Sequence, residues 1–176
     1  KKGYLDVQFL EGGIVAWKNS NLKLSKSMPS ITQSNYTPNI IPRSLSTLLT
    51  TRLAIENEHV AIVDSRSKDE YDGKYSKAKN KGHIPKAINI PWDLNLLPTD
   101  GTFKLKTKED LEKIYAKLKH FDDTIVYCNF GKESALTYLI MRSMGRRVSV
   151  YDGAWLEWGN DLSLPVEHEL SREQES

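Results

Sequence analysis

The sequence lacks the features that mark several large classes of protein. It has one cysteine in 176 residues and a net charge of only +2. A single cysteine excludes an intrachain disulfide and a metal site built from a cysteine cluster. The small net charge argues against a domain that binds nucleic acid through a strongly basic surface, and no apolar run approaches the roughly 18 residues of a membrane span. We therefore expect one soluble domain with some additional chain, and no metal or other cofactor.

Two segments of the chain, separated by about the length of a domain, have similar sequence patterns. Residues 7–17 and 148–158 each read as a short strand, a glycine-containing turn and a helix with a tryptophan five positions after the glycine. Such an offset indicates a duplicated domain whose first copy is mostly absent. The start, Lys-Lys-Gly without methionine or signal peptide, likewise suggests part of a longer protein and does not distinguish a cytoplasmic from a periplasmic location. We therefore divide the chain into the end of a preceding domain (1–24), a linker rich in Ser, Asn, Thr and Pro (25–39), a complete domain (40–168) and a polar tail (169–176).

Short apolar runs alternate with helical patterns in the complete domain. The runs expected to be strands are 60–63, 87–90, 124–127 and 148–151. Helical patterns cover 44–55, 67–72, 107–120 with Thr107 as N-cap, 133–144 and the residues after Gly153. Apolar strands without polar alternation, separated by helices, are typical of a parallel sheet that is covered on both faces.

The cysteine stands where such a sheet usually binds ligands. Cys128 ends an apolar run, and a short loop separates it from the next helix. Ligands of open α/β sheets bind outside the carboxyl ends of the strands. Gly131 would let backbone N–H groups of the loop and the helix N-terminus face the sulfur, so we expect a thiol pKa below about 8.5. On these residues alone, an inert buried cysteine stays open as an alternative.

Four motifs in a fixed order resemble the rhodanese family. They are 63–66 (Val-Asp-Ser-Arg), 82–91 (Gly-His-Ile-Pro-Lys-Ala-Ile-Asn-Ile-Pro), 127–134 (Tyr-Cys-Asn-Phe-Gly-Lys-Glu-Ser) and 151–153 (Tyr-Asp-Gly) followed by Trp158. The resemblance implies an α/β fold with a central five-stranded parallel sheet flanked by helices on both faces. It also implies the C-terminal, cysteine-bearing domain of a tandem-domain protein similar to thiosulfate sulfurtransferases, with an N-terminal rhodanese-like domain as its partner.

The resemblance further implies sulfur transfer through Cys128. The cysteine would accept a sulfane sulfur from a small anionic donor, either thiosulfate-like or an organic persulfide, and pass it to a thiol or cyanide. We expect the donor to be bound by Asn129, Phe130, Gly131, Lys132, Glu133, Ser134 and Arg66. We interpret His83 and Asp64 as structural residues.

Two positions depart from the family members that use thiosulfate. The resemblance predicts a basic side chain four residues after Arg66 and another two residues after Cys128, and these positions hold Glu70 and Phe130. Lys132 could compensate, although Glu133 beside it offsets the charge. The departures leave sulfur transfer plausible and weaken the case for thiosulfate as the natural donor.

Other chemistries fit the sequence less well. A phosphatase or arsenate reductase on a similar fold would need a Cys-x5-Arg loop, and the sixth residue after Cys128 is Ser134. A thiol-disulfide oxidoreductase would need a second cysteine. A non-enzymatic rhodanese-like module for binding, sulfur carriage or regulation stays open as the alternative to an enzyme.

Overall fold

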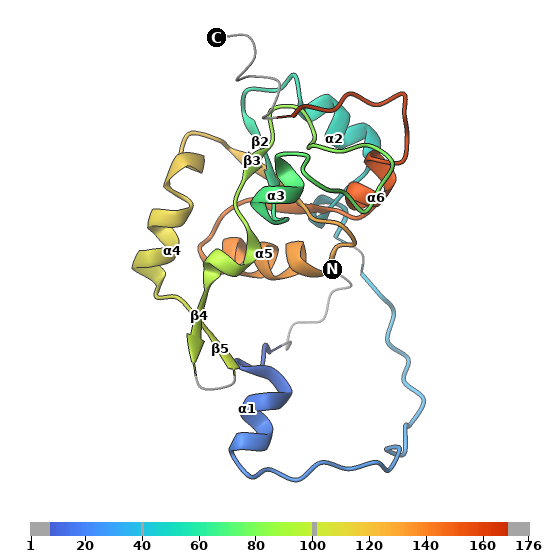
Figure 1. The fold of residues 1–176 in the computed structure, drawn as a ribbon. Helices are drawn as coiled ribbons and strands as arrows, with labels where there is room; N and C mark the ends of the chain where they lie inside the picture. Colours follow the sequence, from blue (N-terminus) through green and yellow to red (C-terminus); the bar gives the residue numbers. More distant parts are fainter. Residues whose placement is uncertain (1–7, 40, 100–101, 169–176) are drawn as a thin grey trace.

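A five-stranded parallel sheet forms the centre of the molecule in a computed structural model that describes residues 8–39, 41–99 and 102–168 (Figure 1). Its strands are β1 (Leu45–Ser46), β2 (Val60–Asp64), β3 (Ile88–Asn89), β6 (Asp123–Tyr127) and β7 (Val148–Tyr151). The spatial order is β1-β7-β6-β2-β3, and every neighbouring pair is parallel. The expected five-stranded parallel sheet is therefore confirmed.

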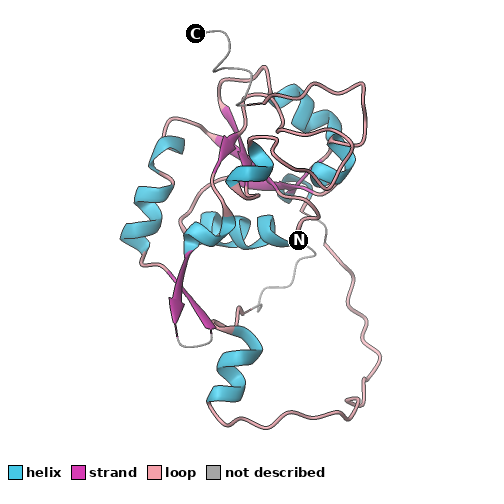
Figure 2. Cartoon of the chain, viewed as in Figure 1, coloured by secondary structure: helices cyan, strands magenta, loops and turns pink. Residues whose placement is uncertain are grey.

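Helices cover both faces of this sheet, as predicted (Figure 2). One face packs with α2 (Leu48–Ala54), α3 (Lys68–Tyr71) and α6 (Ala154–Trp158), and the other with α4 (Lys108–Ile114) and α5 (Lys132–Ser143). Alternate residues of one strand pack on opposite faces of the sheet. In β6, Ile125 and Tyr127 belong to the apolar core on the α2, α3 and α6 side, and Val126 belongs to the core on the α4 and α5 side. A strand buried on both faces is mostly apolar, which explains the short apolar runs in the sequence.

The helix starts follow from local capping chemistry. Thr107 accepts a hydrogen bond from the backbone N–H of Asp110, which confirms the predicted N-cap. Thr47 and Ser67 each form a reciprocal capping box, with Thr50 and Glu70 respectively. These caps begin the helices that follow β1 and β2.

The predicted helix over 44–55 is wrong at its beginning. Pro42–Ser44 form a short 3-10 helix (η1), and Leu45 and Ser46 then pair with Val150 and Tyr151 as the edge strand β1. Only after the Thr47 cap does the helix begin. A two-residue strand has no hydrophobic period of its own, so its partner β7 determines it.

A second, antiparallel sheet was not predicted. It is a hairpin of β4 (Leu96–Thr99) and β5 (Thr102–Leu105), which follows the 3-10 helix η2 (Trp92–Asn95). A further 3-10 helix, η3 (Ala116–Leu118), completes the elements after α4.

The N-terminal part of the described chain lies against this hairpin. Helix α1 (Gly13–Asn19) is preceded by Glu11, whose carboxylate accepts a hydrogen bond from the Leu105 N–H at 2.8 Å. Thr102 donates a hydrogen bond to the Gly12 carbonyl at 3.0 Å. The strand expected before this helix is not present at residues 8–10, and Val7 lies outside the described residues. Residues 22–39 then run without helix or strand (Figure 1).

The remaining predictions concern the C-terminal tail and the absence of a membrane-spanning segment. The expected polar tail, 169–176, lies outside the described residues. Within the described residues, no helix is both long and apolar enough to cross a bilayer.

Candidate active site

Cys128 lies at the point where the strand order of the sheet reverses. It directly follows β6, and the neighbouring strand β2 ends at Asp64. From β2 the sheet continues outward to β3, whereas from β6 it continues in the opposite direction to β7. A crevice outside the carboxyl ends of such diverging strands is the usual ligand site of an open α/β sheet.

The start of α6 holds the backbone around the cysteine. The Trp155 N–H donates to the Cys128 carbonyl at 2.8 Å, and the Leu156 N–H donates to the Asn129 carbonyl at 3.3 Å. Ala154, just before them, is fully buried and has a φ of 56°. A left-handed conformation is unfavourable for alanine, so packing must maintain it here. This turn fixes the position of the cysteine loop against α6.

The loop brings a backbone donor to the sulfur, as expected. Gly131 has a φ of 84° and its N–H donates to the Cys128 sulfur at 3.1 Å. Glycine adopts this left-handed conformation without steric penalty. Helix α5 begins at the next residue, so the sulfur lies beside a helix N-terminus.

The protonation state of Cys128 differs from the prediction. The thiol is fully buried. Burial raises its pKa above the usual 9.0, and a hydrogen bond to the Glu133 carboxylate raises it further, against lowering hydrogen bonds from Ser134 and the loop backbone. The expected low thiol pKa is therefore wrong, because desolvation of the thiolate outweighs the N–H groups that stabilise it.

Arg66 forms a buried ion pair at the end of β2. Its guanidinium donates to both carboxylate oxygens of Asp64 at 2.6–3.0 Å and to the Gly82 carbonyl at 2.7 Å. Neither side chain of the pair is exposed. Burial is the largest single influence and lowers the pKa of Arg66, but the charge of Asp64, its hydrogen bonds and the neighbouring Tyr127 and Glu70 together raise it more, so the pKa lies well above its usual value. Tyr127 also donates a hydrogen bond to Asp64, at 2.7 Å.

The geometry supports a structural role for Asp64 and leaves one donor atom of Arg66 available. Within the described residues, Nη1 of Arg66 has no hydrogen-bond partner. The guanidinium also lies 4.2 Å from the ring centre of Trp155. A donor contact by Arg66 stays a prediction.

A carboxylate lies where the resemblance predicts a cation. Glu70 is 5% exposed, and it accepts hydrogen bonds from the Asn129 side-chain amide at 2.7 Å and from the Ser67 hydroxyl at 2.8 Å. Burial alone would raise the pKa of Glu70, but these hydrogen bonds and the charge of Arg66 lower it below its usual value. Asn129 therefore connects the cysteine loop to α3 through a charged partner.

A small cavity of about 100 Å³ opens beside the loop. It is lined by Arg66, Ser67, Glu70, Lys77, Trp92, Asp93, Asn129 and Glu133. Three of the lining residues have a buried polar atom with no hydrogen-bond partner among the described residues: Nη1 of Arg66, Oδ1 of Asn129 and Oε2 of Glu133. Buried polar atoms are nearly always paired, so this concentration of unpaired atoms marks the cavity as a place for a polar ligand.

The structure brings together most of the predicted site residues. Gly131, Glu133, Ser134 and Asn129 surround the sulfur or the cavity, whereas Phe130 is 51% exposed and Lys132 is exposed at the start of α5. The sequence analysis missed Asp93 and Lys77, which line the cavity, and Lys77 lies 5.3 Å from the ring centre of Phe130. The spacing of these residues from Cys128 carries no signal, because the fold alone brings them together.

The contacts of His83 support the structural role that we predicted for it. It is 1% exposed and its Nδ1 lies 2.8 Å from the Tyr71 carbonyl. Its ring stacks on that of Tyr71 with centres 3.6 Å apart. These contacts position the turn that supplies the Gly82 carbonyl to Arg66.

Comparison with known proteins agrees with this geometry. Residues 49–161 match the model of the rhodanese-like domain. The chain belongs to the rhodanese-like family. It is 32% identical over 179 residues to the thiosulfate sulfurtransferase of Corynebacterium glutamicum, which covers 94% of this chain. It is 34% identical over 179 residues to a Saccharopolyspora erythraea protein that is named provisionally as a thiosulfate sulfurtransferase. This match also covers 94% of this chain. The rhodanese-like chain spans 58% and 62% of the lengths of these two relatives.

Solved structures give the same family fold. EanB with hercynine superposes with a TM-score of 0.82 at 29% identity and covers 95% of this chain and 42% of its own. A second EanB structure, with ergothioneine covalently linked to a cysteine persulfide, superposes with a TM-score of 0.81 at 25% identity over the same shares. Rhodanese-like structures of this kind thus include one with a persulfide on a cysteine.

Proposed function

We propose that this chain is the cysteine-bearing domain of a sulfurtransferase, in which Cys128 carries a sulfane sulfur as a persulfide. The observation that carries the proposal is the position of Cys128: it lies at the strand-order reversal, its sulfur accepts a loop N–H, and unpaired polar atoms line the cavity beside its loop. The sequence similarity to the thiosulfate sulfurtransferase of C. glutamicum supports the same activity.

The proposed reaction has two displacement steps. The Cys128 thiolate attacks the outer sulfur of the donor, the sulfur–sulfur bond of the donor breaks, and the remainder leaves with the electron pair. The resulting persulfide is then attacked at its terminal sulfur by a thiolate or by cyanide, and the Cys128 thiolate leaves. The Gly131 N–H donates to the Cys128 sulfur and would stabilise the negative charge that this sulfur carries before the first step and after the second.

For the donor, we propose an organic persulfide rather than thiosulfate. The charge of Arg66 is already matched by Asp64, and the carboxylates of Glu70, Asp93 and Glu133 line the cavity together with one lysine, Lys77. A dianion would meet more carboxylates than free cations there. The exposed ring of Phe130 offers an apolar contact to an organic group instead.

The decisive experiment is intact mass spectrometry of the chain after incubation with thiosulfate, with an organic persulfide and with no donor. We expect the mass of one added sulfur with the organic persulfide, its loss after addition of cyanide, and no addition to Cys128→Ser. Sulfur addition without turnover in the presence of excess acceptor would instead favour a sulfur-carrier or regulatory module. No sulfur addition from any donor would contradict the proposal.

We also propose that residues 1–24 end a preceding rhodanese-like domain, that 25–39 are a linker, and that the complete domain occupies 40–168. Helices α1 and α6 start 141 positions apart, and Gly13 and Ala154, their first residues, have φ values of 57° and 56°. Around α1, Phe9, Ile14 and Phe103 are more than half exposed, which a preceding domain would cover. Hydrogen exchange of the α1 amides tests this: exchange should be slower in the longer protein than in this chain, and equal rates would contradict it.

A further inference from the structure

A second and larger cavity lies at the opposite end of the sheet from Cys128. Its volume is about 570 Å³, within the usual range for small-molecule sites. Its walls come from η1, α2, α5 and the first residues of β6 and β7, whereas Cys128 follows the last residue of β6. The cavity is therefore separate from the candidate active site.

The short edge strand creates this cavity. β1 pairs only with Val150 and Tyr151 of β7. The preceding residues of β7, Val148 and Ser149, thus extend beyond β1 and line the cavity. The hydroxyl of Ser149 pairs with that of Ser46 at 2.6 Å, which closes the end of the cavity nearest β1.

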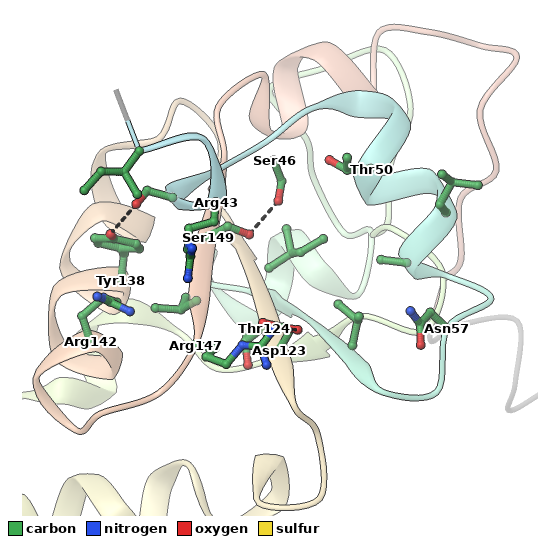
Figure 3. Close-up of a pocket in the computed structure, with 17 residues that line it drawn as sticks. Arg43, Ser46, Thr50, Asn57, Asp123, Thr124, Tyr138, Arg142, Arg147 and Ser149 are labelled. Carbon is green, nitrogen blue, oxygen red and sulfur yellow. Dashed lines mark hydrogen bonds and ion pairs between the residues drawn. The ribbon is translucent and has the colours of Figure 1, made fainter. Parts of the chain in front are cut away.

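One side of the cavity is basic. Arg43, Arg142 and Arg147 all line it, and Figure 3 shows their side chains on the side where α5 and η1 lie. Arg147 is paired with Asp123 at 2.9 Å. The side chains of Arg43 and Arg142 form no hydrogen bond or ion pair with any other residue that the structure describes. Two guanidinium groups with no counterion in the described part of the chain thus border one cavity.

The other side of the cavity is apolar. Leu53 and Ala54 of α2 and Val60 at the start of β2 line it. Leu53 is 64% exposed, so a ligand would remove apolar surface from water on this side. On the basic side, next to Arg142, the Tyr138 hydroxyl donates a hydrogen bond to Ser44 at 3.2 Å (Figure 3).

We propose that this cavity binds a small amphiphilic carboxylate, an organic acid with an aliphatic chain or a ring. The carboxylate would lie between Arg43 and Arg142, because guanidinium groups bind carboxylates through paired N–H donors. The apolar part would lie against Leu53 and Val60, where burial is favourable in proportion to its area. A single ligand of this kind satisfies both sides of the cavity.

The test is isothermal titration of the chain with octanoate as the probe, compared with octanamide and acetate. Octanamide has the chain without the charge, and acetate has the charge without the chain, so both should bind at least tenfold more weakly than octanoate. Arg142→Gln and Arg43→Gln should each weaken octanoate binding about three- to tenfold, as expected for loss of one partly exposed charge-assisted contact. Leu53→Gln should weaken it by a similar factor.

A matched control separates this site from general charge attraction. Arg52 is on α2 but does not line the cavity, so Arg52→Gln lowers the net charge equally and should leave octanoate affinity unchanged. Circular dichroism and alkylation of Cys128 should also be unchanged in all variants, which shows that the fold is intact. Equal binding of octanoate and octanamide, equal weakening by Arg52→Gln and Arg142→Gln, or no octanoate binding would each overturn the proposal.

Discussion

Replacing Arg66 by methionine should strongly destabilise the fold. The change removes three hydrogen bonds to Asp64 and one to the Gly82 carbonyl. Asp64 then keeps the Tyr127 hydroxyl and one backbone N–H as partners, but its charge is fully buried without a cation. Leaving one charge of a buried pair uncompensated costs about 3–5 kcal/mol. At about 2–4 °C per kcal/mol for a chain of this size, the melting temperature should fall by roughly 6–20 °C.

Equilibrium unfolding in urea, followed by circular dichroism, measures this loss. In the double variant Asp64→Asn/Arg66→Met the buried charge is gone, so its free energy of unfolding should exceed that of Arg66→Met alone. Arg147→Met is the matched surface control, because its ion pair with Asp123 is exposed on both sides and should contribute less than about 1 kcal/mol. A loss below about 1 kcal/mol for Arg66→Met, or a double variant less stable than that single variant, would refute the reasoning.

Three further predictions concern the cysteine loop. Cys128→Ser should abolish sulfur transfer to cyanide with an unchanged melting curve, and turnover by this variant would remove Cys128 from the mechanism. Glu133→Gln removes a carboxylate that raises the pKa of Cys128, and the thiolate forms as the pH rises through that pKa. The inflection in the rate of Cys128 alkylation should therefore move to lower pH than in the unaltered chain, and an unmoved inflection would contradict the contact. Phe130→Lys should raise kcat/KM for thiosulfate, because it restores a cation two residues after Cys128. Lys132→Ala should lower kcat/KM less than about fivefold, because Lys132 is exposed. Steady-state kinetics that show no gain in Phe130→Lys would contradict the electrostatic account.

The central strands were predictable because burial on both faces leaves a local signal. β2, β6 and β7 are mostly apolar, and all three lie between the edge strands β1 and β3. β1 was missed since Leu45 and Ser46 are too few to form a pattern, and only pairing with β7 defines them. The β4–β5 hairpin was missed for a related reason: its strands are mostly exposed, and Pro98 within β4 argues against a strand.

The candidate site was predictable in its position but not in its electrostatics. The loop after Cys128 could be located because strand, glycine and helix follow one another directly in the sequence. The Asn129–Glu70 hydrogen bond joins residues 59 positions apart, and no local pattern reports such a contact. The thiol pKa was mispredicted for the same reason, because it depends on complete burial of Cys128 and on the orientation of Glu133, both products of tertiary packing.

The raised thiol pKa and the acidic cavity together constrain how the proposed transfer can proceed. Burial and the Glu133 hydrogen bond raise the pKa of the Cys128 thiol and so disfavour its thiolate at neutral pH, and we expect the nucleophile to form when the donor binds. A donor that displaces water would strengthen the Gly131 N–H contact to the sulfur. The bound donor would also be repelled by the neighbouring carboxylates of Glu70 and Glu133 if it is an anion. An organic persulfide carries less charge than thiosulfate at this pH and therefore meets less repulsion, so the Glu133 carboxylate that disfavours the thiolate would also help to select the donor.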